Sequence, residues 1–182
     1  MRGCNICPEE VEVINTFDDP VTTEESQARA AVSGWTYYLT TQRQPVGNNA
    51  SLFFQITNPV GSGRILHIGR IIGTSNSNLI ITLNRNGSFA AAGTSVTPVN
   101  SNFASTNTSV ATVKFVIQVA DPTVGGAIFG DFIQPSNGGA VPFEYNGRIV
   151  MPPGTTFVVR ELNNSGGSII ASLNISFWET TH

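Results

Sequence analysis

The chain has 182 residues, a formal net charge of −3, only 12% charged side chains and a mean hydropathy of +0.05. This length suits one domain that buries a core without metal or disulfide staples. No stretch approaches the ~18 consecutive apolar residues of a membrane span, and no basic stripe of the kind that binds nucleic acid is present. Soluble domains contain about 25% charged residues, so the low value indicates either a neutral Ser/Thr/Asn-rich surface or extensive burial against copies of the chain.

The charges are distributed unevenly along the sequence. Residues 1–35 carry seven acidic and two basic side chains, whereas the rest of the chain carries five acidic and seven basic ones. An acidic segment on a mildly basic body can steer one copy toward another, although a terminal segment is often simply more charged than a folded domain. The first residues, MRGCNICPEEVEVINTF, lack the apolar core of a signal peptide. Export by the usual route is therefore not expected.

Residues 1–20 are expected to form an N-terminal connector arm. Within it, valines alternate with glutamates over 10–17, and this period of two is typical of an extended strand. A terminal strand pairs either with its own sheet or with the sheet of a neighbouring copy. The residues predicted to take part in strand addition are Glu10, Val11, Glu12, Val13, Ile14 and Phe17.

Residues 21–34 are expected to form a linker with a short helix over 22–32. A threonine can cap the start of this helix, Glu24 and Glu25 lie in its first turn, and Gly34 follows its end.

From residue 35 onward the pattern is one of strands, and residues 35–182 are expected to form a single all-β domain. Strands are predicted over 35–41, 51–57, 64–72, 78–85, 110–120, 127–134, 141–150, 155–162 and 169–177. Residues 44–49 are expected to form a loop, and 88–109 a long surface loop with a short strand. Gly69 is expected to mark a bulge or a close approach of another segment. The last two strands, joined by NNSGG, are predicted to form a hairpin. About eight short strands without helices between them indicate an antiparallel β-sandwich, and we predict a jelly roll with an extended N-terminal arm.

The two cysteines, Cys4 and Cys7, form a C-x-x-C motif on the arm. A zinc site would need another pair of ligands, and a redox couple would need the start of a helix in a thioredoxin-like unit. The thiols can also pair with each other or with the arms of other chains, or they can remain inert. Because the rest of the chain has no cysteine, we favour intermolecular disulfides between arms.

No constellation of residues indicates a reaction. The two histidines are His67, expected to be packed or at the surface of an apolar strand, and the terminal His182, so a Ser-His-Asp set is not credible. A paired-carboxylate glycosidase site is conceivable, but the acidic residues of the body are expected to be exposed near strand ends. They are Asp121, Asp131, Glu144, Glu161 and Glu179. We therefore expect no catalytic residue, no cofactor and no metal site, and a protein that is not an enzyme.

Four segments carry a resemblance to a known family: LFFQITNPVGSGRILHIGRI at 52–71, LIITLNRNG at 79–87, IVMPPGTTFVV at 149–159 and SIIASLNISFWE at 168–179. They resemble the single-jelly-roll proteins of spore-forming Firmicutes. With its N-terminal C-x-x-C arm, the whole chain is similar to the subunits of bacterial endospore appendages. Those are pilus-like fibres whose connectors reach into a neighbouring subunit and are locked by disulfides. One feature departs from that pattern, because such connectors commonly bridge to cysteines in a neighbour's body and this body has none.

The resemblance implies a structural subunit that assembles with copies of itself into a fibre or a stack of rings, through strand addition by the arm and disulfides between arms. It also implies assembly in the mother cell and a location at the surface of a spore or cell. Further candidate partners are an anchoring protein and a surface glycan. The alternative is a carbohydrate- or receptor-binding jelly-roll module of a virion or a C1q-like trimer. Its sugar site would be lined by the aromatic residues Trp35, Tyr37, Tyr38, Tyr145 and Trp178.

Overall fold

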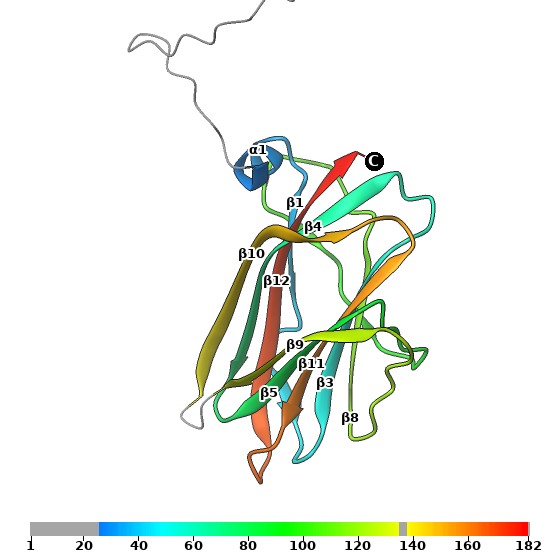
Figure 1. The fold of residues 1–182 in the computed structure, drawn as a ribbon. Coiled ribbons are helices and arrows are strands. Elements are labelled where there is room, and N and C mark those ends of the chain that lie inside the picture. Colours follow the sequence, from blue (N-terminus) through cyan, green and yellow to red (C-terminus); the bar gives the residue numbers. More distant parts are fainter. Residues whose placement is uncertain (1–25, 135–137, 182) are drawn as a thin grey trace, which may run out of the picture.

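The computed structural model describes residues 26–134 and 138–181. Two antiparallel sheets pack face to face (Figure 1), and α1 (Ser26–Val32), the one helix among the described residues, lies near one end of the sandwich. The predicted all-β antiparallel sandwich is confirmed.

The sheet that we call sheet A runs in the order β10-β4-β12-β1-β7, with β2 also paired to β12. Its strands are β1 (Thr36–Thr40), β2 (Gln44–Val46), β4 (Arg64–Ser75), β7 (Val99–Asn100), β10 (Gly139–Met151) and β12 (Ile169–Thr181). Sheet B runs in the order β6-β8-β3-β11-β5-β9. Its strands are β3 (Ser51–Asn58), β5 (Leu79–Arg85), β6 (Thr94–Ser95), β8 (Thr112–Gln118), β9 (Ala127–Gln134) and β11 (Thr155–Asn163).

The core lies between the two sheets and follows from the period-two pattern of their strands. In β12, Leu173, Ile175 and Phe177 are buried in this core, while Ser172 and Asn174 point to the other face and are only partly covered. Alternate residues of β3, β5 and β11 meet them from sheet B. Burial of each such aliphatic or aromatic side chain contributes about 1.5–3 kcal/mol, so the apolar inner faces hold the sheets together.

The predicted hairpin between the last two strands is wrong. β11 pairs with β3 and β5 in sheet B, whereas β12 pairs with β4, β1 and β2 in sheet A. The turn after β11 therefore carries the chain across the sandwich, over about 10 Å. The side-chain amide of Asn163 holds this turn by donating to the carbonyls of Val46 and Gly167 at 2.9 and 2.7 Å. Alternation identifies a strand with one buried face but says nothing about its partner.

The first predicted loop is partly wrong, because Gln44–Val46 forms β2. The second, 88–109, contains two short strands, β6 and β7, where one short strand was predicted. The start of the second loop also covers the outer face of sheet B, where Phe89 packs with Phe53 and Val158 in a separate apolar cluster. The ammonium group of Lys114 fixes this loop by donating to the carbonyl of Phe89 at 2.7 Å. As a result, β3 is covered on both faces.

α1 packs on sheet A where β4 has a bulge. The register of β4 skips Gly69 against both β10 and β12, and a β-carbon at Gly69 would lie 3.1 Å from the side-chain oxygen of Gln27 in α1. The prediction of a bulge or a close approach at this glycine is confirmed, since both occur. The helix ends at Val32, and Gly34 follows its end as predicted, with φ of +73° and an amide that donates to the carbonyl of Ala31 at 3.0 Å. Residues 22–25, predicted to begin the helix, lie outside the described residues.

Candidate interaction sites

The site residues predicted from the sequence lie on the arm. Cys4, Cys7 and the strand-addition segment 10–17 fall outside the described residues, so their roles stay predictions. The described residues are α1 and the strands and loops of the body.

His67 is packed, as predicted. Its ring stacks on Trp178 with centroids 5.3 Å apart and planes inclined by 13°, and Nε2 lies 3.0 Å from the hydroxyl oxygen of Thr180. A β-carbon at Gly147 would collide with the indole ring, so the β10 segment lies directly over this stack. Burial lowers the pKa of the imidazole below its ordinary value. His67 is therefore a neutral packing residue at pH 7.

The acidic residues of the body divide into two groups. Three lie at or near the surface with partners, as expected: Glu144 with Arg70 (2.6 Å), Asp121 with Arg160 (3.3 Å) and Asp131 with the hydroxyl of Thr82 (3.0 Å). The prediction of exposure is wrong for Glu161 and Glu179, which are buried. The signal for Glu161 was present in the sequence, because it continues the alternation of inward-facing residues along β11.

Glu161 lies in the core between the sheets. It is fully buried, and neither carboxyl oxygen has a hydrogen-bond partner among the described residues. A β-carbon at Gly73 of β4 would lie 2.6 Å from Oε1, so only a glycine leaves room for the carboxyl group. Burial raises the pKa of Glu161 to about 8, which makes the group mainly protonated at pH 7. Without access to solvent it cannot meet a substrate.

Glu179 is buried but has donors. Its Oε1 accepts from the hydroxyl of Ser109 at 2.6 Å and from the amide of Val110 at 3.0 Å. Burial raises the pKa of Glu179, while these hydrogen bonds act in the opposite direction. Glu161 and Glu179 belong to opposite sheets. Among the described residues, no group of three or more His, Cys, Asp or Glu could hold a metal ion.

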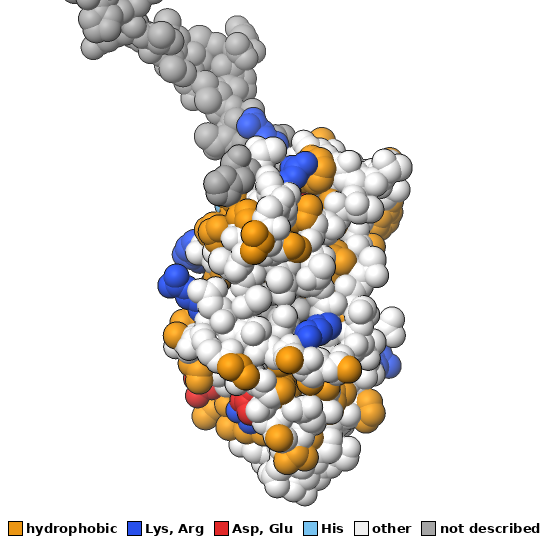
Figure 2. All heavy atoms as spheres, turned by 90° about the vertical axis from the view of Figure 1, so that its right-hand side faces the viewer, with side chains coloured by type: hydrophobic (Ala, Val, Ile, Leu, Met, Phe, Trp, Pro, Cys, Tyr) orange, Lys and Arg blue, Asp and Glu red, His pale blue; other side chains and the backbone are white. Residues whose placement is uncertain are grey.

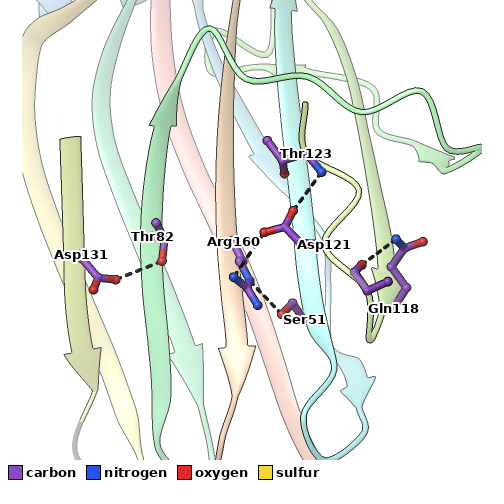
Figure 3. A network of polar contacts seen from close by, with 8 residues as sticks. Ser51, Thr82, Gln118, Asp121, Thr123, Asp131 and Arg160 are labelled. Atoms are coloured by element: carbon purple, nitrogen blue, oxygen red, sulfur yellow. Dashed lines mark hydrogen bonds and ion pairs between the residues drawn. The ribbon is translucent and has the colours of Figure 1, made fainter. Parts of the chain in front are cut away.

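A polar network ties the outer face of sheet B together. The Nε of Arg160 donates to the hydroxyl of Ser51 at 3.0 Å, and the guanidinium lies 3.3 Å from the carboxylate of Asp121 (Figure 3). That carboxylate also accepts from the amide of Thr123 at 2.9 Å. Half-exposed pairs of this kind contribute about 0–1 kcal/mol, so the network positions the segment after β8 rather than supplying much stability.

The aromatic residues predicted for a sugar site do not form one exposed surface. Tyr37 is fully buried and Trp178 is only 4% exposed. Tyr37 and Tyr38 are neighbours in β1, so their side chains point to opposite faces of sheet A. Tyr38, at 54% exposed, is the tyrosine of this pair that a ligand can reach.

A groove of about 580 Å³ runs between the edges of the two sheets. We call it the β1–β6 groove. None of the described residues that line it is acidic or basic. Hydroxyl and amide groups predominate among its polar lining residues, which include Tyr38, Thr40, Gln42, Thr94, Ser95 and Asn174. The scarcity of charge extends beyond this groove. Figure 2 shows a face of the sandwich on which uncharged atoms and scattered hydrophobic side chains far outnumber charged groups.

A second cleft, of about 560 Å³, lies between β9, β10 and the start of β11. Its floor includes Phe129, Val150, Met151 and Phe157. Arg85 and Arg148 also line it, and both are exposed. None of the described residues that line it is acidic. Within the described part of the chain neither arginine forms an ion pair, and Arg148 donates only to the carbonyls of Glu144 and Tyr145. We call this the Arg85/Arg148 cleft.

The edges beside this cleft differ in character. Among the described residues β9 pairs only with β5, and its Ile128 and Ile133 are 65% and 77% exposed. It has one bulge, at Phe129, and is regular over 130–134. Within the same described part of the chain β10 pairs only with β4, but it contains Pro142 and loses register over 145–148. Because proline and bulges hinder pairing with a further strand, the open apolar edge on this side of the sandwich is β9 over 130–134.

Comparison of the chain with family models, with curated proteins and with solved structures gives no match. The described residues contain no helix with the length and apolarity needed to cross a membrane.

Proposed function

We propose that this chain is a structural subunit that assembles with copies of itself into a fibre or a stack of rings, similar to an endospore appendage. In this proposal residues 1–20 are the connector and the body is a jelly roll. The strand order supports the jelly roll, because β10-β4-β12-β1 and β3-β11-β5-β9 are the two four-stranded layers that two Greek keys produce. An open sandwich of this kind keeps sheet edges, whose unpaired amides and carbonyls can accept another strand.

The observation that carries the proposal is the unpaired apolar edge of β9. A long edge strand with exposed isoleucines would be an aggregation hazard if nothing covered it. An extended segment from a neighbouring copy can cover it by adding a strand beyond β9, with main-chain hydrogen bonds supplying affinity.

The arm is a suitable donor for this edge. Residues 10–17 would span about 26 Å at 3.3 Å per residue, which is long enough to cover the regular stretch 130–134 of β9 and to reach past its bulge at Phe129. Addition of the arm of one copy to the edge of the next is a head-to-tail contact, and such contacts generate closed rings or open helical fibres. Disulfides between Cys4 and Cys7 of different arms would then lock the assembly covalently, at the surface of a spore or cell.

Negative-stain microscopy, sedimentation and non-reducing gels of the full-length chain test the proposal. We expect fibres or stacked rings, and covalent ladders that collapse with reductant. Deletion of residues 1–17 should give a monomer with an unchanged circular dichroism spectrum. Replacing both cysteines by serine should remove the ladders but leave noncovalent assembly in place. A full-length chain that stays monomeric at high concentration would contradict the proposal.

A second candidate function is the binding of a neutral carbohydrate in the β1–β6 groove. The hydroxyl and amide groups of the groove and the absence of acidic or basic side chains from its lining favour an uncharged polyhydroxylated ligand. The exposed ring of Tyr38 offers an apolar surface with a polar tip. Glycan-array binding that Tyr38→Ala abolishes, by discrete trimers that do not depend on residues 1–17, would favour this function over the fibre.

A further inference from the structure

We infer that the Arg85/Arg148 cleft is the docking site for the acidic arm segment, residues 9–19, of a second copy of the chain. This inference rests on the proposed function and names the place on the body where the neighbour's arm is held.

Charge complementarity is the first argument. Residues 9–19 contain five acidic side chains and no basic one, while the cleft contains two arginines and no acidic residue. Three other cations of the body already have partners. Arg70 and Arg160 pair with carboxylates, and Lys114 binds loop carbonyls. Within the described residues, the cleft is thus a place where two exposed arginines lie together without a carboxylate partner.

The apolar pattern of the segment is the second argument. In an extended conformation Val11 and Val13 point to one side and Glu10 and Glu12 to the other. A segment lying in the cleft can place its valines on the apolar floor while its glutamates stay at the solvent side, within reach of the arginines. A wholly charged segment would leave that floor exposed, and a wholly apolar one would leave the arginines unpaired.

Continuity with the open edge is the third argument. Phe129 belongs to β9 and also lines the cleft, where its ring lies 5.8 Å from that of Phe157. Phe129 is also the bulged residue of β9, so a strand added along the regular stretch 130–134 passes beside the cleft. The same segment can therefore pair with the backbone of 130–134 and place its side chains in the cleft. The edge supplies affinity, and the two arginines select an acidic segment.

A charge swap in the full-length chain tests the inference. Arg85→Glu with Arg148→Glu should abolish assembly in sedimentation, as should Glu10→Arg with Glu12→Arg. The chain that carries all four substitutions should assemble again, because complementarity is restored. A body that was merely damaged could not be rescued in this way. Arg43→Glu, at an exposed arginine that does not line the cleft, is the control and should assemble like the wild type.

A labelled peptide of residues 8–20, added at a chain concentration at which sedimentation shows no assembly, gives a second readout. We expect it to bind the full-length chain, with an affinity weakened roughly tenfold by Arg85→Glu with Arg148→Glu and falling as salt rises. Normal assembly of that double variant would overturn the inference and leave the proposed function standing. A monomeric wild type would overturn the proposed function, and the peptide experiment would then test the cleft by itself. Peptide binding that the double variant loses would support the cleft as the docking site. No binding to the wild type, or equal binding to both chains, would overturn the inference.

Discussion

β3 and β9 are both eight residues long and belong to the same sheet, but their surroundings are opposite. β3 lies between β8 and β11, with seven of its eight residues buried, whereas β9 lies at the edge with one buried. Both strands are rich in isoleucine and phenylalanine. Composition therefore does not distinguish a core strand from an edge strand, because the number of neighbouring strands determines how much of a strand is buried. An apolar strand left with one neighbour is a surface that a partner can complete.

The largest expected loss of stability comes from removing a large side chain that β3 buries in the core. Phe54 is fully buried, so Phe54→Ala should lower the free energy of unfolding by about 3–5 kcal/mol. The matched change in β9, Phe129→Ala, starts from a ring that is 47% exposed and should cost about 1 kcal/mol. Urea unfolding of both variants measures the difference. Equal losses of unfolding free energy would contradict the difference in burial between Phe54 and Phe129.

The next effect concerns Glu161, which pairs with Leu52 of β3 and lies in the same core. Burial raises the pKa of this carboxyl to about 8, so its contribution to stability is fully present below about pH 4.5, the ordinary pKa, and is lost as the pH rises through about 8. Between pH 5 and pH 8 the loss should be on the order of 3 kcal/mol. Urea unfolding across this range measures it.

Glu161→Gln is the control for that pH dependence. Glutamine keeps the shape but cannot ionise, so this part of the pH slope should disappear, while the slope from Glu179 and the surface groups remains. A slope unchanged by the substitution would assign the effect to those other groups.

A smaller loss of stability should follow when the outer face of β3 is uncovered, so that it is exposed like β9. Phe89 covers the outer face of β3 and is 2% exposed. Phe89→Ala should lower the free energy of unfolding by about 2 kcal/mol, less than for a central core residue because the loop can settle onto the sheet. Hydrogen exchange should show faster opening of 86–93. Protection unchanged from the wild type would mean that the hydrogen bond from Lys114, rather than the ring, holds the loop.

The smallest effect on stability is expected at β9 itself. Ile133 is 77% exposed, so Ile133→Lys should change the free energy of unfolding by less than about 0.5 kcal/mol. Assembly should nevertheless fail in sedimentation, because lysine on an edge strand discourages pairing. Val60→Lys, at a turn residue that is 88% exposed, is the control. Loss of assembly in both variants would point to net charge rather than to the β9 edge.

The sequence predicted where strands lie better than it predicted what they contact. The predicted strand 127–134 coincides with β9, because its apolar residues and flanking turns are local features. The partners of β11 and β12 were not predictable, because alternation says nothing about which strand lies alongside. The Arg85/Arg148 cleft was missed for the same reason, since Arg85, Phe129 and Arg148 come from three strands that only the topology brings together. The burial of Glu161 could have been predicted from its alternation with Phe157 and Val159. Exposure was predicted instead, because fully buried carboxyl groups are rare.

The position of β12 has a consequence for how the chain folds during synthesis. β12 follows every other strand in the sequence, yet it lies between β4 and β1 in sheet A. Until the ribosome has released residues 169–181, those two strands lack the neighbour that joins them, and the inner face of sheet B has little to pack against. Such non-local pairing slows folding and leaves unpaired edges exposed. In the proposed assembly, a subunit could therefore receive a neighbour's arm only after its own β12 has been released.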